Sequence, residues 1–490
     1  MPKPVSSAAR AAGRSTQQPA PSSVRPPRPA VIYFFGALGG ILFGYETGVI
    51  AGALSFIQKT PGFPPSAVIT GMLVGGIAAG AVFGALTAGR LADRFGRRPV
   101  IFVIGLVYIV GSLACATAPG NGWLIGARVF LGLAVGGSSS LVPVYLSEMA
   151  PARARGRLAG LNQLMIVTGL LLGYLTNLAL SGTGDWRLML GSGAVPAVVL
   201  IAGLKLLPES PRWLVLNGRE DEARTLLAGT RPLDEAERDI AAIKEVTAHS
   251  SGHGSGLGSG RRELLARWVR PAVVIGIGIP ILTQYTGLNI VTYYAPTIFE
   301  SLGLPHKNAL HFTIVLGTVK VVSVMIGLQL IDRLGRRFLF LAGSAAMTLS
   351  MAWMAYEASR GDQMSAGSML AAMSVMFVSY SLSWGPVNWV VLGEIFPLRI
   401  RGAAMGMACM ISWLATLGIT FGFPVMRDAW GLTNTMIFFV GGNVLGFLFC
   451  RFFVHETRGR TLEEIEEDLH ARYERKRQPQ KAPVENGSLA

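Results

Sequence analysis

Long apolar runs constrain this chain more than any other feature of its sequence. A helix that crosses a bilayer needs roughly 20 apolar residues. About twelve runs of that order lie near 31–57, 67–89, 99–118, 122–146, 158–180, 187–207, 271–299, 309–331, 338–357, 366–392, 403–425 and 433–454. Charged residues make up 14% of the chain, against roughly 25% in a soluble protein. The sequence therefore predicts an all-α membrane protein.

The net charge of +15 is distributed as in a membrane protein rather than a nucleic-acid-binding protein. Residues 1–30 carry five basic residues and no acid. The short loops expected on the same side of the membrane as residues 1–30 contain Arg90, Arg94, Arg97, Arg98, Arg153, Arg155, Arg157, Arg333, Arg336, Arg337, Arg399 and Arg401. The opposite loops carry only Lys59, Arg187, Lys307, Arg360 and Arg427. By the positive-inside rule both termini are expected to be cytoplasmic, in a cell membrane.

Three polar motifs of the first half recur in order in the second half. GRLADRFGRR at 89–98 returns as LQLIDRLGRR at 328–337, SEMAPARARG at 147–156 as GEIFPLRIRG at 393–402, and PESPR at 208–212 more weakly as HETRG at 455–459. The offsets are 239, 246 and 247 residues. Because transporter halves often repeat, we expect six spans, a linker and six more spans.

The predicted organisation has five parts. They are a disordered cytoplasmic tail (1–30), an N-terminal six-helix bundle (31–207), cytoplasmic linker helices (208–268), a C-terminal six-helix bundle (269–454) and a cytoplasmic tail (455–490). In the linker, EDEARTLLAGT and DEAERDIAAIKEVTA have helical periodicity. In the second tail we expect another helix, with Thr461 as its cap and Glu464 three residues on.

The chain resembles the sugar porter family of the major facilitator superfamily from about residue 31 to 469. The motifs that carry this resemblance are GRLADRFGRR, the R-x-x-x-G of Arg128–Gly132, PESPRWL at 208–214, QYTGLNIVTYYAP at 284–296, SWGPVNW at 383–389 and the terminal ETRG with TLEEIE. The resemblance implies two six-helix bundles that bind substrate between them near the bilayer midplane and rock to give alternating access.

Charged residues at the cytoplasmic helix ends are similar to the family's gating pairs. In the first half the set is Asp93, Arg94, Arg97, Arg98, Glu148, Arg155, Glu209 and Arg212. In the second half it is Asp332, Arg336, Arg337, Glu394 and Arg401. If these residues only set the topology, arginines would suffice and the acids would have no role. We therefore interpret the acids and arginines as partners in ion pairs that hold one transport state and break in the other.

Glu46 lies within the apolar run LGGILFGYETGVIAG, where a charge is expensive and therefore indicates function. Its expected partner is Arg128, at the start of the fourth span. Proton-coupled members of the family resemble this chain in having a first-helix acid and an Arg at this place. A buried carboxyl without a partner holds its proton more tightly than one beside a guanidinium. We interpret the pair as the proton-coupling site; a permanent structural salt bridge is the alternative.

Lys320 is the second intramembrane charge and a departure from the family, which usually has Asn there. Thr313, Gly317, Lys320 and Gly327 share a helical stripe that should face the cavity. Three roles are open for Lys320: to hydrogen-bond a polyhydroxy ligand, to select an anionic one, or to pair with a carboxylate or backbone carbonyls.

A sugar site requires amides, hydroxyls and an aromatic face. By resemblance, the substrate-binding residues are Gln163, Thr283, Gln284, Asn289, Tyr293, Tyr294, Lys320, Trp389, Ser412 and Trp413. Tyr293 and Tyr294 match the family's outer gate, and Trp389 matches the tryptophan over the sugar ring. Thr283, Lys320 and Ser412 stand where amides are usual, which puts ordinary glucose chemistry in doubt.

The sequence thus predicts a transporter, not an enzyme, that imports a monosaccharide or sugar alcohol with a proton. The alternative is a proton-independent facilitator of the same substrates. Cys115, Cys409 and Cys450 lie in apolar segments without metal-ligand spacing, and there is no Walker-A loop, so neither a metal nor any other cofactor is expected. A drug exporter is disfavoured because the fifth span lacks G-x-x-x-G-P-x-x-G-G, and a sensor because the tail after Leu469 is short.

Overall fold

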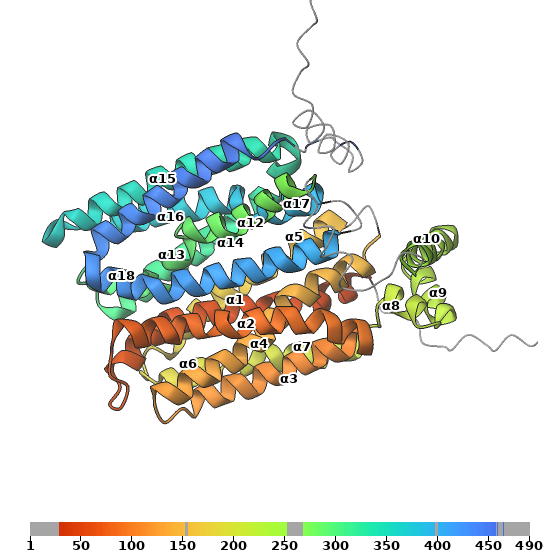
Figure 1. Ribbon diagram of the computed structural model, residues 1–490. Helices are drawn as coiled ribbons and strands as arrows, with labels where there is room; N and C mark the ends of the chain where they lie inside the picture. The colour runs from red at the N-terminus through yellow and green to blue at the C-terminus, as the bar shows by residue number, and fades with distance from the viewer. Residues whose placement is uncertain are drawn as a thin grey trace, which may run out of the picture.

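The computed structural model describes residues 29–151, 155–251, 268–396 and 400–456, with Arg458 and Glu464. Within this part of the chain every regular element is a helix, which confirms the predicted all-α class. Figure 1 shows two groups of long helices that lie alongside each other, one from each half of the chain, with three shorter helices beyond one end. The predicted Thr461 cap lies outside the described residues.

The N-terminal bundle contains six crossings. Five are single helices: α1 (Pro29–Lys59), α2 (Ala67–Phe95), α3 (Arg97–Ala116), α4 (Asn121–Met149) and α5 (Arg155–Leu180). The sixth, over Trp186–Leu206, is divided into α6 (Trp186–Gly191), α7 (Ala194–Gly203) and the 3-10 turn η2 (Leu204–Leu206).

The C-terminal bundle begins with a broken crossing, α12 (Arg270–Tyr285) and α13 (Leu288–Ser301). Gly287 separates them with φ 83°, a left-handed conformation that favours glycine. Then follow α14 (His306–Leu334), α15 (Arg336–Ser359), the turn η3 (Gly361–Gln363) and a second broken crossing, α16 (Ala366–Leu382) and α17 (Trp384–Ile395).

The last element, α18 (Arg401–Phe452), is 52 residues long and accounts for two crossings. At 1.5 Å per residue it would extend about 78 Å, well over twice the hydrocarbon thickness of a bilayer. Gly431 interrupts it with φ 76° and ψ 167°, where two helices meet at a kink. Figure 1 shows α18 turning back on itself between its light-blue and dark-blue parts. Among the described residues, the eleven helical segments that are long and apolar enough to span a membrane therefore make twelve crossings, as predicted.

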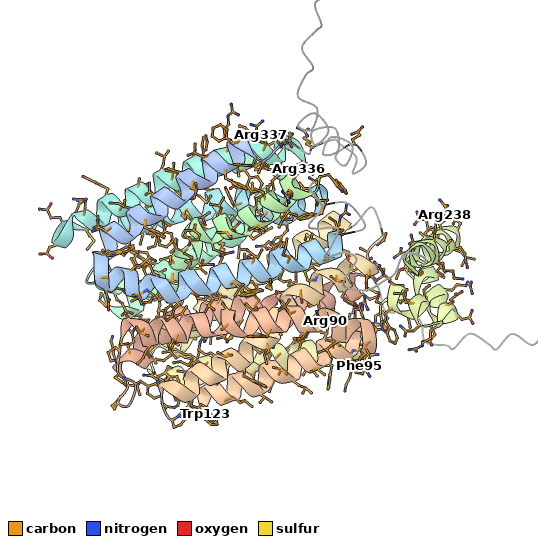
Figure 2. All side chains as sticks on the ribbon, in the orientation of Figure 1. Arg90, Phe95, Trp123, Arg238, Arg336 and Arg337 are labelled. Carbon is orange, nitrogen blue, oxygen red and sulfur yellow. The ribbon has the colours of Figure 1, made fainter. Side chains whose placement is uncertain are left out.

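Three linker helices lie between the bundles in sequence: α8 (Pro211–Leu216), α9 (Glu220–Ala228) and α10 (Leu233–Ser251). They are tied to the N-terminal bundle by the Trp213 indole, which donates to the Asp93 carbonyl at 3.1 Å, and by Arg231, which donates to the Met149 carbonyl at 3.2 Å. Figure 2 shows Phe95 and Arg336 at the end of the bundles that faces these helices and Trp123 at the opposite end. We call these the linker end and the far end.

Glycines every four residues fix α1 against α5. A Cβ at Gly44 would collide with the Ile166 carbonyl oxygen, and one at Gly48 with the Leu170 carbonyl oxygen. Gly40 and Gly52 continue the same stripe against α5. Small residues at this spacing let membrane helices approach at backbone distance. This packing holds one side of α1 against α5 and leaves Glu46 on another side of the helix.

Candidate functional site

Glu46 and Arg128 form an ion pair inside the N-terminal bundle. Arg128 Nη1 on α4 donates to Glu46 Oε1 on α1 at 2.7 Å. Glu46 is 2% exposed and Arg128 is fully buried. A buried charge is tolerable only when it is paired, so each residue stabilises the charged form of the other.

A second contact anchors the guanidinium of Arg128. Its Nε donates to the Leu73 carbonyl of α2 in a close contact, whereas its Nη2 has no hydrogen-bond partner among the described residues. The arginine is thus held by α2 and α4, and the carboxylate comes from α1. Movement of α1 relative to that pair would change the distance between the charges.

The residue after Glu46 contacts the other bundle. The Thr47 hydroxyl lies 3.4 Å from the hydroxyl of Tyr293 on α13. Tyr293 is buried, as is Tyr294, whose hydroxyl donates to the Thr420 carbonyl of α18 at 2.9 Å. The helix that carries the acid is therefore in contact with the segment where the sequence predicted the outer gate.

Three predicted substrate-binding residues form one hydrogen-bonded chain at the break between α12 and α13. Asn289 Nδ2 donates to Gln284 Oε1 at 2.6 Å, and Gln284 Nε2 donates to Ser412 Oγ of α18 at 3.0 Å. The break at Gly287 lets residues on both helices face the same point. Thr283 differs from this group, because its hydroxyl donates to the Ile279 carbonyl of its own helix at 2.7 Å.

The two predicted tryptophans have different surroundings. Trp413 is buried, lies 5.3 Å from Phe43 of α1 between ring centres, and donates to Ser139 Oγ of α4 at 3.3 Å. Trp389 on α17 is 40% exposed. Gln163 on α5 is half-buried. Trp413 thus joins the two bundles, and Trp389 presents an aromatic surface.

Lys320 lies near the middle of α14 and is 9% exposed. Its Nζ is 3.4 Å from Thr292 Oγ1 on α13 and 4.9 Å from the centre of the Phe377 ring on α16. Among the residues that the structure describes, no carboxylate lies within ion-pair distance of it.

The far ends of the two bundles contact each other. The Tyr174 hydroxyl of α5 donates to the Thr292 carbonyl at 2.7 Å, and the Phe56 ring of α1 packs edge-on against His306 of α14 at 4.3 Å. A Cβ at Gly71 of α2 would collide with the Phe421 carbonyl of α18. These contacts close the far end.

At the linker end of the N-terminal bundle the predicted gating residues form a network. Arg97 binds Glu148 through two bonds, Nε to Oε2 at 3.0 Å and Nη2 to Oε1 at 3.1 Å, and also contacts Asp93 at 3.0 Å. The Glu209 carboxylate accepts backbone N–H groups from Arg97 at 2.8 Å and from Arg98 at 3.2 Å. The network joins α2, α3, α4 and the segment before α8.

The C-terminal bundle repeats this arrangement. Arg336 Nη2 donates to Glu394 at 3.1 Å, as Arg97 does to Glu148. The Glu456 carboxylate accepts the backbone N–H groups of Arg336 at 2.9 Å and Arg337 at 3.1 Å, as Glu209 does for Arg97 and Arg98. Sequence reasoning omitted Glu456 from the gating set, although the PESPR–HETRG repeat placed it opposite Glu209.

The other gating candidates contribute differently. Arg94 lies over the Phe95 ring and is exposed, Arg212 is exposed on α8, and Arg401 donates to the Phe396 carbonyl at 3.3 Å. The side chains of Arg155 and Asp332 lie outside the described residues.

Two bundles of six membrane crossings, with polar chains where they meet and matched charge networks at one end, define a transporter of the major facilitator fold. The model of the family described as "Sugar (and other) transporter" matches residues 32–469. The chain belongs to the sugar porter family of the major facilitator superfamily, and is a transporter rather than an enzyme.

Several relatives and solved structures are similar over nearly the whole chain. The probable metabolite transport protein CsbC of Bacillus subtilis is 42% identical, over 94% of this chain and 99% of its own length. The D-xylose transporter of Levilactobacillus brevis is 41% identical, over 90% and 96%. The xylose transporter XylE from E. coli, in a partially occluded inward-open form, is 29% identical with a TM-score of 0.77, over 88% and 99%. A structure of XylE as a proton:xylose symporter bound to 6-bromo-6-deoxy-D-glucose has a TM-score of 0.76 and 29% sequence identity. The match covers 90% of this chain and 99% of that chain.

Proposed function

We propose that this protein imports a monosaccharide or another polyhydroxy sugar derivative together with a proton, by alternating access of one site to the two sides of the cell membrane. The observation that carries the proposal is the buried Glu46–Arg128 pair. An ion pair at membrane depth in a transporter is a candidate proton carrier, because uptake and release of one proton change its charge. The similarity to a proton:xylose symporter supports the same conclusion.

The coupling step is a competition for Glu46 between Arg128 and a proton. While Arg128 is 2.7 Å away, the carboxylate stays ionised. When α1 shifts, Glu46 separates from an arginine that the Leu73 carbonyl holds in place, and a buried carboxyl without its partner takes up a proton. Restoring the pair releases the proton on the other side.

Substrate is connected to this pair through α13. We assign the binding site to the residues around the Asn289–Gln284–Ser412 chain, with Gln163, Trp389, Trp413 and Lys320 around it. Amide groups donate and accept, as sugar hydroxyls do, and an aromatic face covers the apolar side of a ring. A ligand there changes the position of α13, and Tyr293 transmits the change to Thr47, beside Glu46.

The charge networks at the linker end serve as the inner gate. Excess arginine at that end supports a cytoplasmic location for it, and with it for both termini. The Arg97–Glu148 and Arg336–Glu394 pairs hold helix ends together within each bundle. Tyr293 and Tyr294 serve the outer gate at the far end.

Uptake into cells or proteoliposomes, with and without a protonophore, separates the symporter from a proton-independent facilitator. We expect the substrate to accumulate above its external concentration under an inward proton gradient, and the protonophore to abolish that accumulation while leaving exchange intact. Uptake that only equilibrates, unchanged by the protonophore, would establish the facilitator instead.

A further inference from the structure

Lys320 is a buried amine, and two of its neighbours favour its ammonium form without neutralising it. The Phe377 ring lies 4.9 Å from Nζ with its electron-rich face toward the cation. The Thr292 hydroxyl, 3.4 Å away, already donates its hydrogen to the Leu288 carbonyl and therefore offers Lys320 only an acceptor. Both neighbours favour an ammonium, but neither carries a negative charge.

The ammonium has hydrogen-bonding capacity left over. An ammonium has three N–H donors. One is directed to Thr292 and one faces Phe377, so a third donor is available to a ligand. Because a buried charge is stable only when it is paired, the group that completes this site should be an anion.

Lys320 adjoins the site assigned to substrate. Its partner Thr292 lies three residues after Asn289 on α13, and residues at that spacing share one face of a helix. Asn289 begins the hydrogen-bonded chain to Gln284 and Ser412. A ligand whose hydroxyls reach Asn289 can therefore present a second group to Lys320 about one helical turn away.

We propose that the preferred substrate is a sugar acid, an aldonate or a uronate, whose carboxylate binds the Lys320 ammonium while its hydroxyls bind the amides of Gln284 and Asn289. This inference rests on the proposed sugar transport and specifies its substrate class. A sugar monocarboxylate supplies the missing negative charge and the polyhydroxy chain in one molecule. Hydrogen bonds between charged groups are stronger than hydrogen bonds between neutral groups. The difference in free energy corresponds to a change of about tenfold in affinity.

The proposal also fixes the charge moved in each cycle. A monocarboxylate that enters with one proton moves no net charge, whereas a neutral sugar that enters with one proton moves one positive charge. Transport of the preferred substrate should therefore be insensitive to membrane potential. Transport of a neutral sugar should be accelerated by an inside-negative potential.

The test is counterflow in proteoliposomes with three acid–neutral pairs: D-glucuronate with D-glucose, D-galacturonate with D-galactose, and D-gluconate with D-glucitol. For at least one pair, we expect the wild-type protein to exchange the acid about tenfold faster than its neutral partner when both are at the same low concentration. Lys320→Gln should remove this preference. Lys307→Gln, an equal charge change at an exposed position on the same helix, should retain it.

The outcomes separate this inference from the proposed function. Faster exchange of the neutral member in all three pairs would overturn the sugar-acid assignment and leave sugar symport standing. A preference for the acid that survives in Lys320→Gln would overturn the role of Lys320. Exchange of none of the six compounds would overturn the sugar-acid assignment but not sugar symport, which also covers pentoses and other monosaccharides. If Lys320→Gln does not fold, the wild-type preference and its response to a valinomycin potential still decide the assignment.

Discussion

The Tyr174 hydroxyl of the N-terminal bundle donates to the Thr292 carbonyl of the C-terminal bundle at 2.7 Å, and both residues are buried. Thr292 also faces Lys320 through its side chain. One residue of α13 thus meets the other bundle through its backbone and the proposed anion site through its hydroxyl. A bond of this kind stabilises only the state in which the far end is closed.

Tyr174→Phe should shift the protein toward the form that is open at the far end. Loss of one hydrogen bond costs about 0.5–1.5 kcal/mol, which corresponds to a change of about twofold to tenfold in the equilibrium. Distances between spin labels at Lys59 and Lys307, in a background with the three cysteines replaced, would report the shift. Tyr108→Phe is the matched control, since Tyr108 donates to the Leu42 carbonyl at 2.9 Å within one bundle. Equal distance distributions in both variants would refute the gating role of Tyr174.

Gly44→Ala should destabilise the N-terminal bundle. A methyl group there collides with the Ile166 carbonyl, so α1 and α5 must separate. Overpacking of this kind costs about 1–3 kcal/mol. Thermal unfolding in detergent should show a lower midpoint for Gly44→Ala. Gly126→Ala, on α4, has nothing within 4 Å of the added methyl and should unfold like the wild type. Equal midpoints for all three proteins would mean that α1 and α5 do not depend on this contact.

Glu456→Gln should weaken the linker end of the C-terminal bundle in a pH-dependent way. Burial raises the pKa of the Glu456 carboxyl, but backbone N–H groups of Arg336, Arg458 and Arg337 outweigh it and hold the pKa below the ordinary value of 4.5. A lowered pKa means that the ionised group stabilises the fold above its unfolded pKa, and that this stability is lost as the pH falls through the folded pKa.

The measurement is the unfolding midpoint of the wild type and Glu456→Gln between pH 3 and 7, a range that brackets the ordinary glutamate pKa of 4.5. The difference in unfolding midpoint between the wild type and Glu456→Gln should be largest at neutral pH and should shrink as the pH falls. Arg212→Gln, at an exposed residue of the linker, serves as the control. A difference that stays constant with pH would rule out the ionised carboxylate as its source.

Much of the architecture could be predicted because it depends on properties that single residues carry. Apolar run length gave the crossings, and the repeated motifs related Arg97 to Arg336 and Glu148 to Glu394. The Glu46–Arg128 contact was expected because an acid and a base in apolar surroundings have few other partners.

Contacts made by the backbone could not be predicted in the same way. Every residue has a carbonyl, so nothing in the sequence distinguishes the Leu73 carbonyl that anchors Arg128. Hydropathy likewise does not locate the helix break at Gly287, which brings Gln284 and Asn289 together. Glu456 could have been found, because its offset of 247 residues from Glu209 is within one residue of the 246 that separate Glu148 from Glu394.

Proton movement should depend on Glu46 in a way that substrate exchange does not. Gln keeps the shape of the Glu46 side chain but cannot ionise. The Glu46→Gln variant should therefore exchange substrate without transporting protons. Glu357→Gln is the matched control, because Glu357 is 3% exposed and lies at the end of α15, where it binds Ser368 and Arg360. It should transport protons as the wild type does, provided that it folds.

The most direct test records external pH while substrate enters proteoliposomes that contain the wild type or Glu46→Gln, using the compound that exchanges fastest in counterflow. We predict that the wild type alkalinises the medium as substrate enters, and that Glu46→Gln exchanges substrate without any alkalinisation. Equal alkalinisation by Glu46→Gln, or substrate entry through the wild type with no pH change, would contradict the account.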